Sequence, residues 1–216
     1  MQKSIKKLAL LTIFPCLFLN CPQALSQETS RQDSESLATY NFDPNFALEK
    51  ASFTMPSGQK LAYLYPKDFH ETVIATDAIS TISYSEISGR ILISIVENKL
   101  TSQEFASLLK DETFYQGELE KFGDKEHLLW GEYEILNYQK DSQSADLLLK
   151  GFLKKPADGF LPDQHNFFYQ RSILKNNTLV KMTCQVQGSQ AQAAESQMLF
   201  NIVEDKFSQM ANSLDL

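Results

Sequence analysis

The chain has 216 residues and a formal net charge of −7, because 27 Asp and Glu outnumber 20 Lys and Arg. Such an acidic balance excludes binding of nucleic acid or anionic lipid by a general electrostatic attraction. Hydrophobic residues make up 43% of the chain, which is enough for one domain with a substantial core.

The first 26 residues have the three parts of a secretory signal peptide. Three lysines form a basic start, residues 8–19 form an apolar run, and Ala24 and Ser26 have the A-x-S spacing of a cleavage site. The apolar run is shorter than the about 20 residues of a membrane-spanning helix. We therefore predict a signal peptide at 1–26, cleavage after Ser26, and a periplasmic or secreted protein.

Two of the three cysteines, Cys16 and Cys21, lie in this leader. Lipoprotein anchoring through Cys21 is the less favoured alternative, because Phe18, Leu19 and Asn20 before it are not the small residues that a lipidation site needs. Cleavage would leave Cys184 as the single thiol, so that no disulfide can form within the mature chain. The loss of three lysines would bring the net charge to −10.

Residues 27–45 are polar and charged, which predicts a flexible lead-in, and residues 46–216 are expected to form a single α+β domain. Residues 46–55 and 60–65 predict a first hairpin, and residues 78–86 and 90–97 predict a second one around Ser88-Gly89. In the last of these strands, alternation places Ile91, Ile93 and Ile95 on one buried face.

A helix is predicted at about 102–112, because Thr101 and Glu104 form a capping-box pattern before an apolar stripe. The following segment, residues 114–127, is too mixed for a prediction. Further strands are predicted at 128–139, 145–155, 166–175 and 178–187, with Asn176-Asn177 as a tight turn between the last two.

The remainder after Gly188-Ser189 contains neither Pro nor Gly and predicts an amphipathic helix of five to six turns. It should cover the sheet face that carries Val180, Met182 and Val186. The expected fold is α+β, an antiparallel sheet of about six strands covered by a mid-chain helix and a long C-terminal helix. The stripe of that last helix that faces the sheet is predicted to comprise Ala191, Ala194, Met198, Ile202, Lys206-Phe207 and Met210.

Standard catalytic and metal-binding motifs are absent from the sequence. The histidines are the natural candidates for a general base, but His70, His127 and His165 all lie in polar contexts typical of exposed or turn residues. Cys184 could be a nucleophile, yet its place among alternating apolar residues predicts a buried and inert thiol.

Glu132 and Glu134 are two residues apart, so on a strand both carboxylates point to one side and could serve hydrolysis or bind a cation. The favoured interpretation is the solvated face of a strand whose core side is Tyr133 and Ile135. We assign no catalytic, cofactor-binding or metal-ligating residue and expect no cofactor. Ligand-binding residues stay open, although aromatic residues could line an apolar pocket instead of filling the core. These are Tyr133, Tyr138, Phe167, Phe168 and Tyr169.

The order of elements in the C-terminal third, a strand, an asparagine turn, a strand and a helix that ends in Ser213-Leu214, resembles the end of the Mog1/PsbP-like fold. This resemblance implies an antiparallel sheet between helices and a role in binding or assembling a partner. It carries over no functional residue. A helix-grip fold also combines a sheet with a long C-terminal helix. This sequence, however, lacks the pair of short helices that such a fold usually has, which would lie between Met55 and Ala62.

Three functions follow from these observations. The first is an exported, non-enzymatic binding or assembly protein of the bacterial envelope, whose partner is another envelope protein. The second is a carrier of a small apolar ligand between the sheet and the C-terminal helix. The third is a hydrolase that uses dispersed residues such as Glu132, Glu134 and His165. No transmembrane segment is expected after cleavage, and the oligomeric state stays open.

Overall fold

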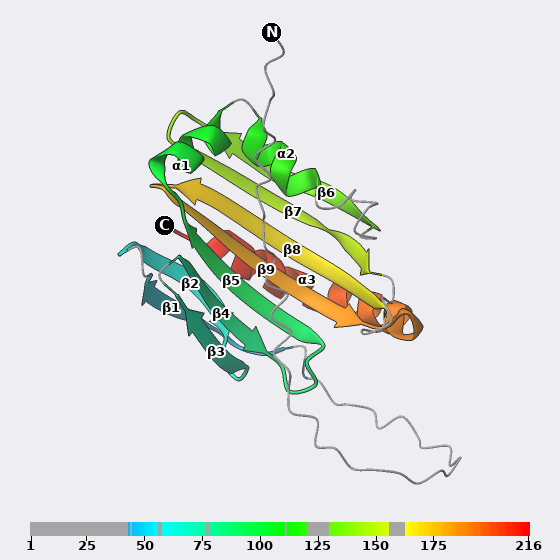
Figure 1. Cartoon of the computed structure of the whole chain (residues 1–216). Coiled ribbons are helices and arrows are strands. Elements are labelled where there is room, and N and C mark those ends of the chain that lie inside the picture. The colour runs from blue at the N-terminus through cyan, green and yellow to red at the C-terminus, as the bar shows by residue number, and fades with distance from the viewer. Residues whose placement is uncertain are drawn as a thin grey trace, which may run out of the picture. The chain divides into compact units, whose positions relative to one another are not determined.

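Seven antiparallel strands form the larger of two sheets in the computed structural model, which describes residues 43, 45–55, 58–76, 78–110, 112–120, 130–155 and 163–216. The spatial order of the strands is β3-β4-β5-β9-β8-β7-β6 (Figure 1). The predicted leader and His127 lie outside the described residues. The strands are β3 (His70–Ala75), β4 (Ile79–Ser85), β5 (Ile91–Lys99), β6 (Trp130–Lys140), β7 (Ser144–Lys155), β8 (Gln164–Lys175) and β9 (Thr178–Gly188).

This sheet consists of two antiparallel meanders. The strands β3, β4 and β5 pair in chain order, and so do β6, β7, β8 and β9. The pairing of β5 with β9, from Ile91–Val186 to Lys99–Thr178, joins the two groups. The asparagine turn between β8 and β9 is as predicted, since Asn176 and Asn177 have φ values of 52° and 58°.

A smaller sheet is the hairpin of β1 (Leu48–Thr54) and β2 (Lys60–Pro66), as the sequence predicts. It is tied to the end of the chain by backbone hydrogen bonds between Ala62 and Asp215. The Leu64 amide also donates a 2.7 Å hydrogen bond to Ser213 Oγ.

Helices cover the two faces of the large sheet separately (Figure 1). The short helices α1 (Ser102–Leu109) and α2 (Thr113–Leu119) pack on one face. The long helix α3 (Ala193–Ser213), which follows the 3-10 turn η2 (Gln190–Gln192), packs on the other face against β8 and β9. The α+β class is therefore confirmed, with seven strands and a hairpin sheet in place of about six strands.

The main core lies between α3, the β1–β2 hairpin and the large sheet. Ile91, Ile93 and Ile95 are buried on this side, as predicted, and so are the alternate residues of β9 from Val180 to Val186. A second core lies under α1 and α2, where Phe114 packs against Leu147, Leu149 and Phe168 among others. The sheet is thus buried on both faces along β7 and β8.

The predicted stripe of α3 is wrong in its first half. Met198 and Ile202 are 66% and 57% exposed, and Ala191 and Ala194 are exposed as well. The helix instead buries Phe200 and Val203 together with the correctly predicted Phe207 and Met210. Residues 198 and 200 are separated by about 200° around a helix, so only one of two apolar stripes can face the sheet. The stripe with two phenylalanines buries more apolar area and is the one that packs.

Two elements were not predicted. The mixed segment after α1 forms the helix α2, and residues 70–75 form the edge strand β3, whose side chains alternate between exposed and half-buried. Within the described part of the chain, no helix has the length and apolar character that crossing a membrane requires.

Candidate functional site

A cleft of about 240 Å³ lies where the β1–β2 hairpin meets β3 and β4. Tyr63 and Tyr65 are two residues apart on β2 and therefore share a face. Tyr84 on β4 and Glu71 on β3 are direct cross-strand partners and share the opposing face. We call this site the tyrosine cleft. Its lining residues are Lys50, Ala51, Ser52, Phe53, Tyr63, Tyr65, Glu71, Val73, Ile82 and Tyr84.

The three tyrosines of the cleft are held by one another. The hydroxyls of Tyr63 and Tyr84 lie 2.8 Å apart in a buried hydrogen bond. The ring of Tyr65 stacks on that of Tyr84 with centroids 5.1 Å apart and an interplanar angle of 29°. The Tyr65 hydroxyl donates to Glu49 at 3.2 Å, and Glu49 pairs with Lys67 at 2.8 Å. The rings are therefore fixed before any ligand arrives.

The hydroxyls stay protonated well above neutral pH. Burial raises the pKa of Tyr84, and the Tyr63 hydroxyl and the Glu71 carboxylate raise it further. Burial also raises the pKa of Tyr63, with a contribution from Glu71. Each hydroxyl can thus donate or accept a hydrogen bond, but none is a base at neutral pH.

A larger pocket of about 330 Å³ lies where α3 ends, lined by residues of β6, β7, β8 and the last residues of the chain. Its main charged groups are already engaged. Arg171 forms two hydrogen bonds to Asp146, at 3.0 and 2.7 Å, and donates to the carbonyls of Ala211, Asn212 and Leu214. We interpret this pocket as the anchor of the helix end.

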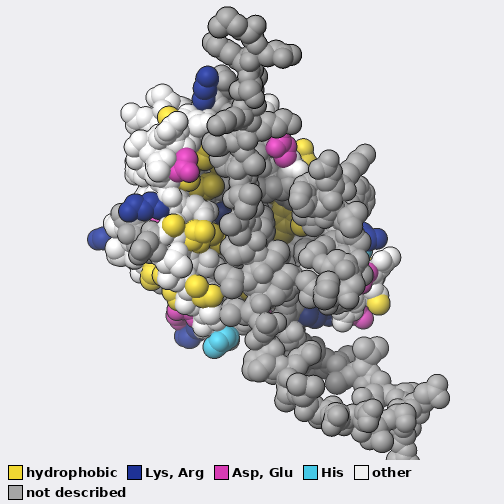
Figure 2. Space-filling view, viewed as in Figure 1, with side chains coloured by type: hydrophobic (Ala, Val, Ile, Leu, Met, Phe, Trp, Pro, Cys, Tyr) yellow, Lys and Arg dark blue, Asp and Glu magenta, His cyan; other side chains and the backbone are white. Residues whose placement is uncertain are grey.

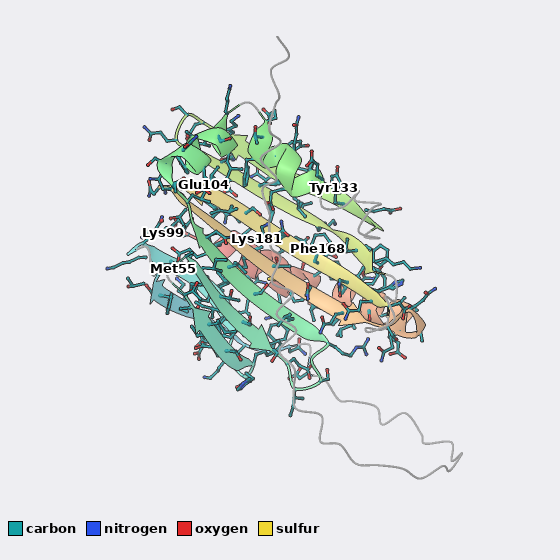
Figure 3. All side chains as sticks on the ribbon, in the orientation of Figure 1. Met55, Lys99, Glu104, Tyr133, Phe168 and Lys181 are labelled. Carbon is teal, nitrogen blue, oxygen red and sulfur yellow. The ribbon has the colours of Figure 1, made fainter. Side chains whose placement is uncertain are left out.

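A buried polar cluster fixes α2 to the sheet. Glu118 of α2 pairs with Lys181 of β9 at 2.8 Å and accepts hydrogen bonds from Gln170 and Ser172 of β8. Figure 3 shows Lys181 and Phe168 on the side of the sheet that carries α2. The carboxylate is satisfied by protein groups, so this cluster is structural.

Among the elements that the structure describes, no helix covers β4 and β5 on this same side of the sheet. Figure 2 shows hydrophobic side chains scattered among polar ones on this face. Half-buried Ile79, Leu92 and Val96 alternate along these strands with residues buried on the α3 side. Serines and threonines lie between them, and we identify no chemistry on this surface.

Cys184 is buried, as predicted, and is a free thiol. Burial raises its pKa, so a nucleophilic thiolate is disfavoured. The interface between α3 and β9, where this cysteine lies, is filled by Phe200, Val203 and Phe207. Neither described pocket opens between α3 and the sheet, so the apolar-ligand hypothesis gains no support there.

The prediction of an exposed or turn histidine holds for His70, which begins β3 and is exposed. It is wrong for His165, which lies within β8 and is 8% exposed. Its ring contacts that of Phe152 at a centroid distance of 5.2 Å. Burial lowers the pKa of His165, and Lys154 lowers it further. The strand β8 begins two residues before its predicted start, which places His165 within the sheet opposite Gly188 of β9.

Glu132 and Glu134 are exposed on β6, as the favoured interpretation predicts. Glu134 pairs with Lys150 at 3.3 Å. The predicted core side of this strand is wrong, because Tyr133 and Ile135 are 41% and 37% exposed. The strand is the edge of the sheet, and a register shift between Ile135 and Asn137 turns it locally.

The structure does not assemble the dispersed hydrolase site. Strands β6 and β8 flank β7, so Glu132 and His165 are separated by about two strand spacings of 4.8 Å each. The Phe152 ring lies against His165 on the intervening strand. In the described ranges, no group of three or more His, Cys, Asp or Glu residues could hold a metal ion.

The aromatic residues singled out in the sequence fill the core in part. Phe167, Phe168 and Tyr169 are buried, whereas Tyr133 is exposed and Tyr138 is half-buried. The tyrosines of the cleft were not singled out. The alternation of Tyr63 and Tyr65 was visible in the sequence, but Glu71 lies on the unpredicted strand β3, so their meeting could not be inferred.

No family model and no curated protein sequence matches the chain. Solved structures do. Cyanobacterial PsbP (CyanoP) from Synechocystis sp. PCC 6803 is 12% identical, with a TM-score of 0.47 over 78% of this chain and 92% of that chain. The Saccharomyces cerevisiae Ran-binding protein Mog1p is also 12% identical, with a TM-score of 0.42 over 78% and 96%. These two proteins bear the names of the fold that the C-terminal third of the sequence resembles, and identities this low transfer no functional residue.

Proposed function

We propose that the chain is an exported, non-catalytic binding or assembly protein of the bacterial envelope, and that it binds a protein partner at the tyrosine cleft. The observation that carries this proposal is the make-up of the cleft. It combines rigid tyrosine rings with hydroxyls and one carboxylate, and it contains no thiol and no histidine. Tyrosine offers a large apolar face with a polar tip at little conformational cost, which suits recognition.

The cleft also has an apolar lip. Val73 on the edge strand β3 is 46% exposed beside the rings. An exposed apolar residue next to buried aromatic anchors is the arrangement in which a partner residue gains most from burial. The signal-peptide pattern of residues 1–26 supports export of the chain.

Photocrosslinking in the native host tests the proposal. We would replace Val73 by p-benzoylphenylalanine and, as a matched control, Ile135, which is 37% exposed on the opposite edge strand of the sheet. We expect an exported protein to crosslink at position 73 and not at position 135. The crosslink should disappear when Tyr65→Leu is added, because this change removes the half-buried ring of the cleft.

Equal crosslinking at both positions, or a crosslink that survives Tyr65→Leu in a protein with an unchanged circular dichroism spectrum, would contradict docking at the cleft. The location is tested separately by the mass of the N-terminus. We expect the protein from the periplasm or the medium to begin at Gln27, and a lipid on Cys21 would replace the free exported form by the anchored one.

A further inference from the structure

The charges around the tyrosine cleft are unbalanced towards negative. Glu49 at the rim is neutralised by Lys67, whereas no cation among the described residues pairs with Glu71. The charge of Glu71 raises the pKa of Tyr63 and Tyr65, and its carboxylate raises that of Tyr84 through a hydrogen bond as well as through its charge. Within the described ranges, the carboxylate of Glu71 is therefore not balanced by a positive charge in the cleft.

Lys50 does not supply the missing positive charge. It is opposite Leu64 in the hairpin, whereas Ala51 is opposite Tyr63. Since successive side chains point to opposite faces of a strand, Lys50 points away from the face that carries Tyr63. Consistent with this placement, Lys50 is not among the charges that influence the pKa of any of the three tyrosines.

The rings add a second source of attraction for a cation. The faces of tyrosine rings carry negative potential and attract ammonium and guanidinium groups. The stacked rings of Tyr65 and Tyr84 are held in place by packing, so their orientation costs a ligand little. Phe53, Val73 and Ile82 line the rest of the cleft and suit a short alkyl stem.

We propose that the tyrosine cleft binds an organic cation with a short apolar stem, which rests on the half-buried ring of Tyr65 and pairs with Glu71. A volume of about 240 Å³ is below the 300–1,000 Å³ typical of drug-sized ligands. It suits a single lysine or arginine side chain or a small quaternary amine. This inference rests on the proposed function for the identity of the site and adds the chemistry that the site recognises.

Ligand titration of the purified protein tests the charge requirement. The probes are choline and N-acetyl-lysine amide, each compared with a neutral probe of similar shape, 3,3-dimethylbutan-1-ol and N-acetyl-norleucine amide. Binding is followed at low ionic strength by the shifts of the tyrosine ring resonances. We expect each cation to bind about fivefold more tightly than its neutral counterpart. The stronger of the two cations distinguishes a free quaternary amine from a lysine side chain of a partner.

Two isosteric variants locate the effect. Glu71→Gln removes the carboxylate of the cleft, and Glu132→Gln makes the same change of charge on the exposed edge strand β6. We expect Glu71→Gln to abolish the preference for the cation and Glu132→Gln to leave it intact. Equal binding of neutral and cationic probes, equal effects of the two variants, or no saturable binding of either cation by the folded protein would overturn the proposal.

The results separate this inference from the proposed function. Cation binding without a crosslink from position 73 would leave the cation site standing and remove the protein partner. A Tyr65-dependent crosslink without any preference for cationic probes would keep the partner and remove the cation site.

Discussion

Arg171 is the residue that joins the large sheet to the end of α3. Its guanidinium contacts the carboxylate of Asp146 on the neighbouring strand and three backbone carbonyls at the helix end. The last carbonyls of a helix lack the regular i+4 donor, and that of Ala211 accepts only a 3.4 Å hydrogen bond from the Leu214 amide. A fixed cation therefore adds a partner for these carbonyls and also opposes the negative end of the helix dipole. The planar fork of arginine makes these contacts at once, which lysine cannot do.

We expect Arg171→Met to lower the free energy of unfolding by about 3 kcal/mol, because it leaves Asp146 partly buried without its partner. Urea unfolding measures the change. The control is Arg90→Met, whose ion pair with the exposed Glu195 spans 3.4 Å and should matter far less. A similar loss of stability in both variants would show that the contacts of Arg171 at the end of α3 stabilise the fold no more than an exposed ion pair does.

His165 makes stability depend on pH. Its pKa is lowered from 6.5, mainly by burial. When the pH falls from 7 to 5, the unfolded chain therefore takes up a proton at this residue before the folded protein does, and the free energy of unfolding decreases. We expect His165→Gln to flatten this part of the stability profile, measured by urea unfolding at several pH values. The matched control is His70→Gln, at an exposed position on β3.

At the scale of elements, two glycines differ in the space around their Cα atoms. Gly151 on β7 lies so close to β6 that a Cβ atom would overlap the carbonyl of Glu132 and crowd the ring of Phe168. Gly117 lies in α2, and a Cβ atom there would meet nothing within 4 Å. The first glycine allows the edge strand to pack, whereas the second only weakens its helix.

Alanine at each glycine should therefore have effects of opposite sign. We expect Gly151→Ala to destabilise the protein by about 2 kcal/mol through displacement of β6. Gly117→Ala should stabilise it by up to about 1 kcal/mol, because alanine is the better helix former. Thermal unfolding of both variants, with hydrogen exchange of the β6 amides, checks the pair. Destabilisation by both changes would contradict this account of α2.

The sequence was most informative where one face of an element is clearly buried. The strand β9 alternates strictly because its Val180 to Val186 face meets α3, and its prediction was confirmed. The edge strand β3 was missed because neither of its faces is fully buried, so polar and apolar residues do not alternate along its sequence. In α3, two apolar stripes compete, and packing against the sheet selects between them. Periodicity alone could not make this choice.

The candidate site depended on information that no local pattern contains. Tyr63 and Tyr65 belong to the hairpin sheet, while Tyr84 and Glu71 belong to the large sheet. Their contact arises only when the hairpin packs across the edge of that sheet. A sequence therefore identifies strands that carry aromatic residues, but it does not show which of these residues will share a cleft.

On the scale of the whole molecule, the two sheets are joined through the end of α3. Ser213 Oγ accepts a hydrogen bond from the Leu64 amide and donates one to the Met210 carbonyl, both at 2.7 Å. The bridge between Ala62 and Asp215 lies beside it. The position of the hairpin, and hence one wall of the tyrosine cleft, thus depends on how the helix ends.

We expect Ser213→Ala to lower the free energy of unfolding by about 1 kcal/mol, because the Leu64 amide loses its acceptor. Hydrogen exchange should become faster in β1 and β2 and stay unchanged in β5 and β9. Ser208→Ala on the same helix is the control, because the Ser208 hydroxyl accepts its hydrogen bond from Asn212 of the same helix and not from the hairpin. Uniformly faster exchange would instead indicate a general loss of stability.

The order of strands in the large sheet bears on how the chain folds. Each meander can form from neighbouring hairpins, which close within microseconds. The two meanders are joined by the pairing of β5 with β9, which we call the seam. Its pair Lys99–Thr178 encloses residues 100–177 in the sequence. Once the second meander has formed, residues 100–129 remain between β5 and that meander, and the entropy of closing this connection is lost before the contacts of the seam are gained. We therefore expect the transition state for folding to lie at this seam, with the two meanders already formed on either side.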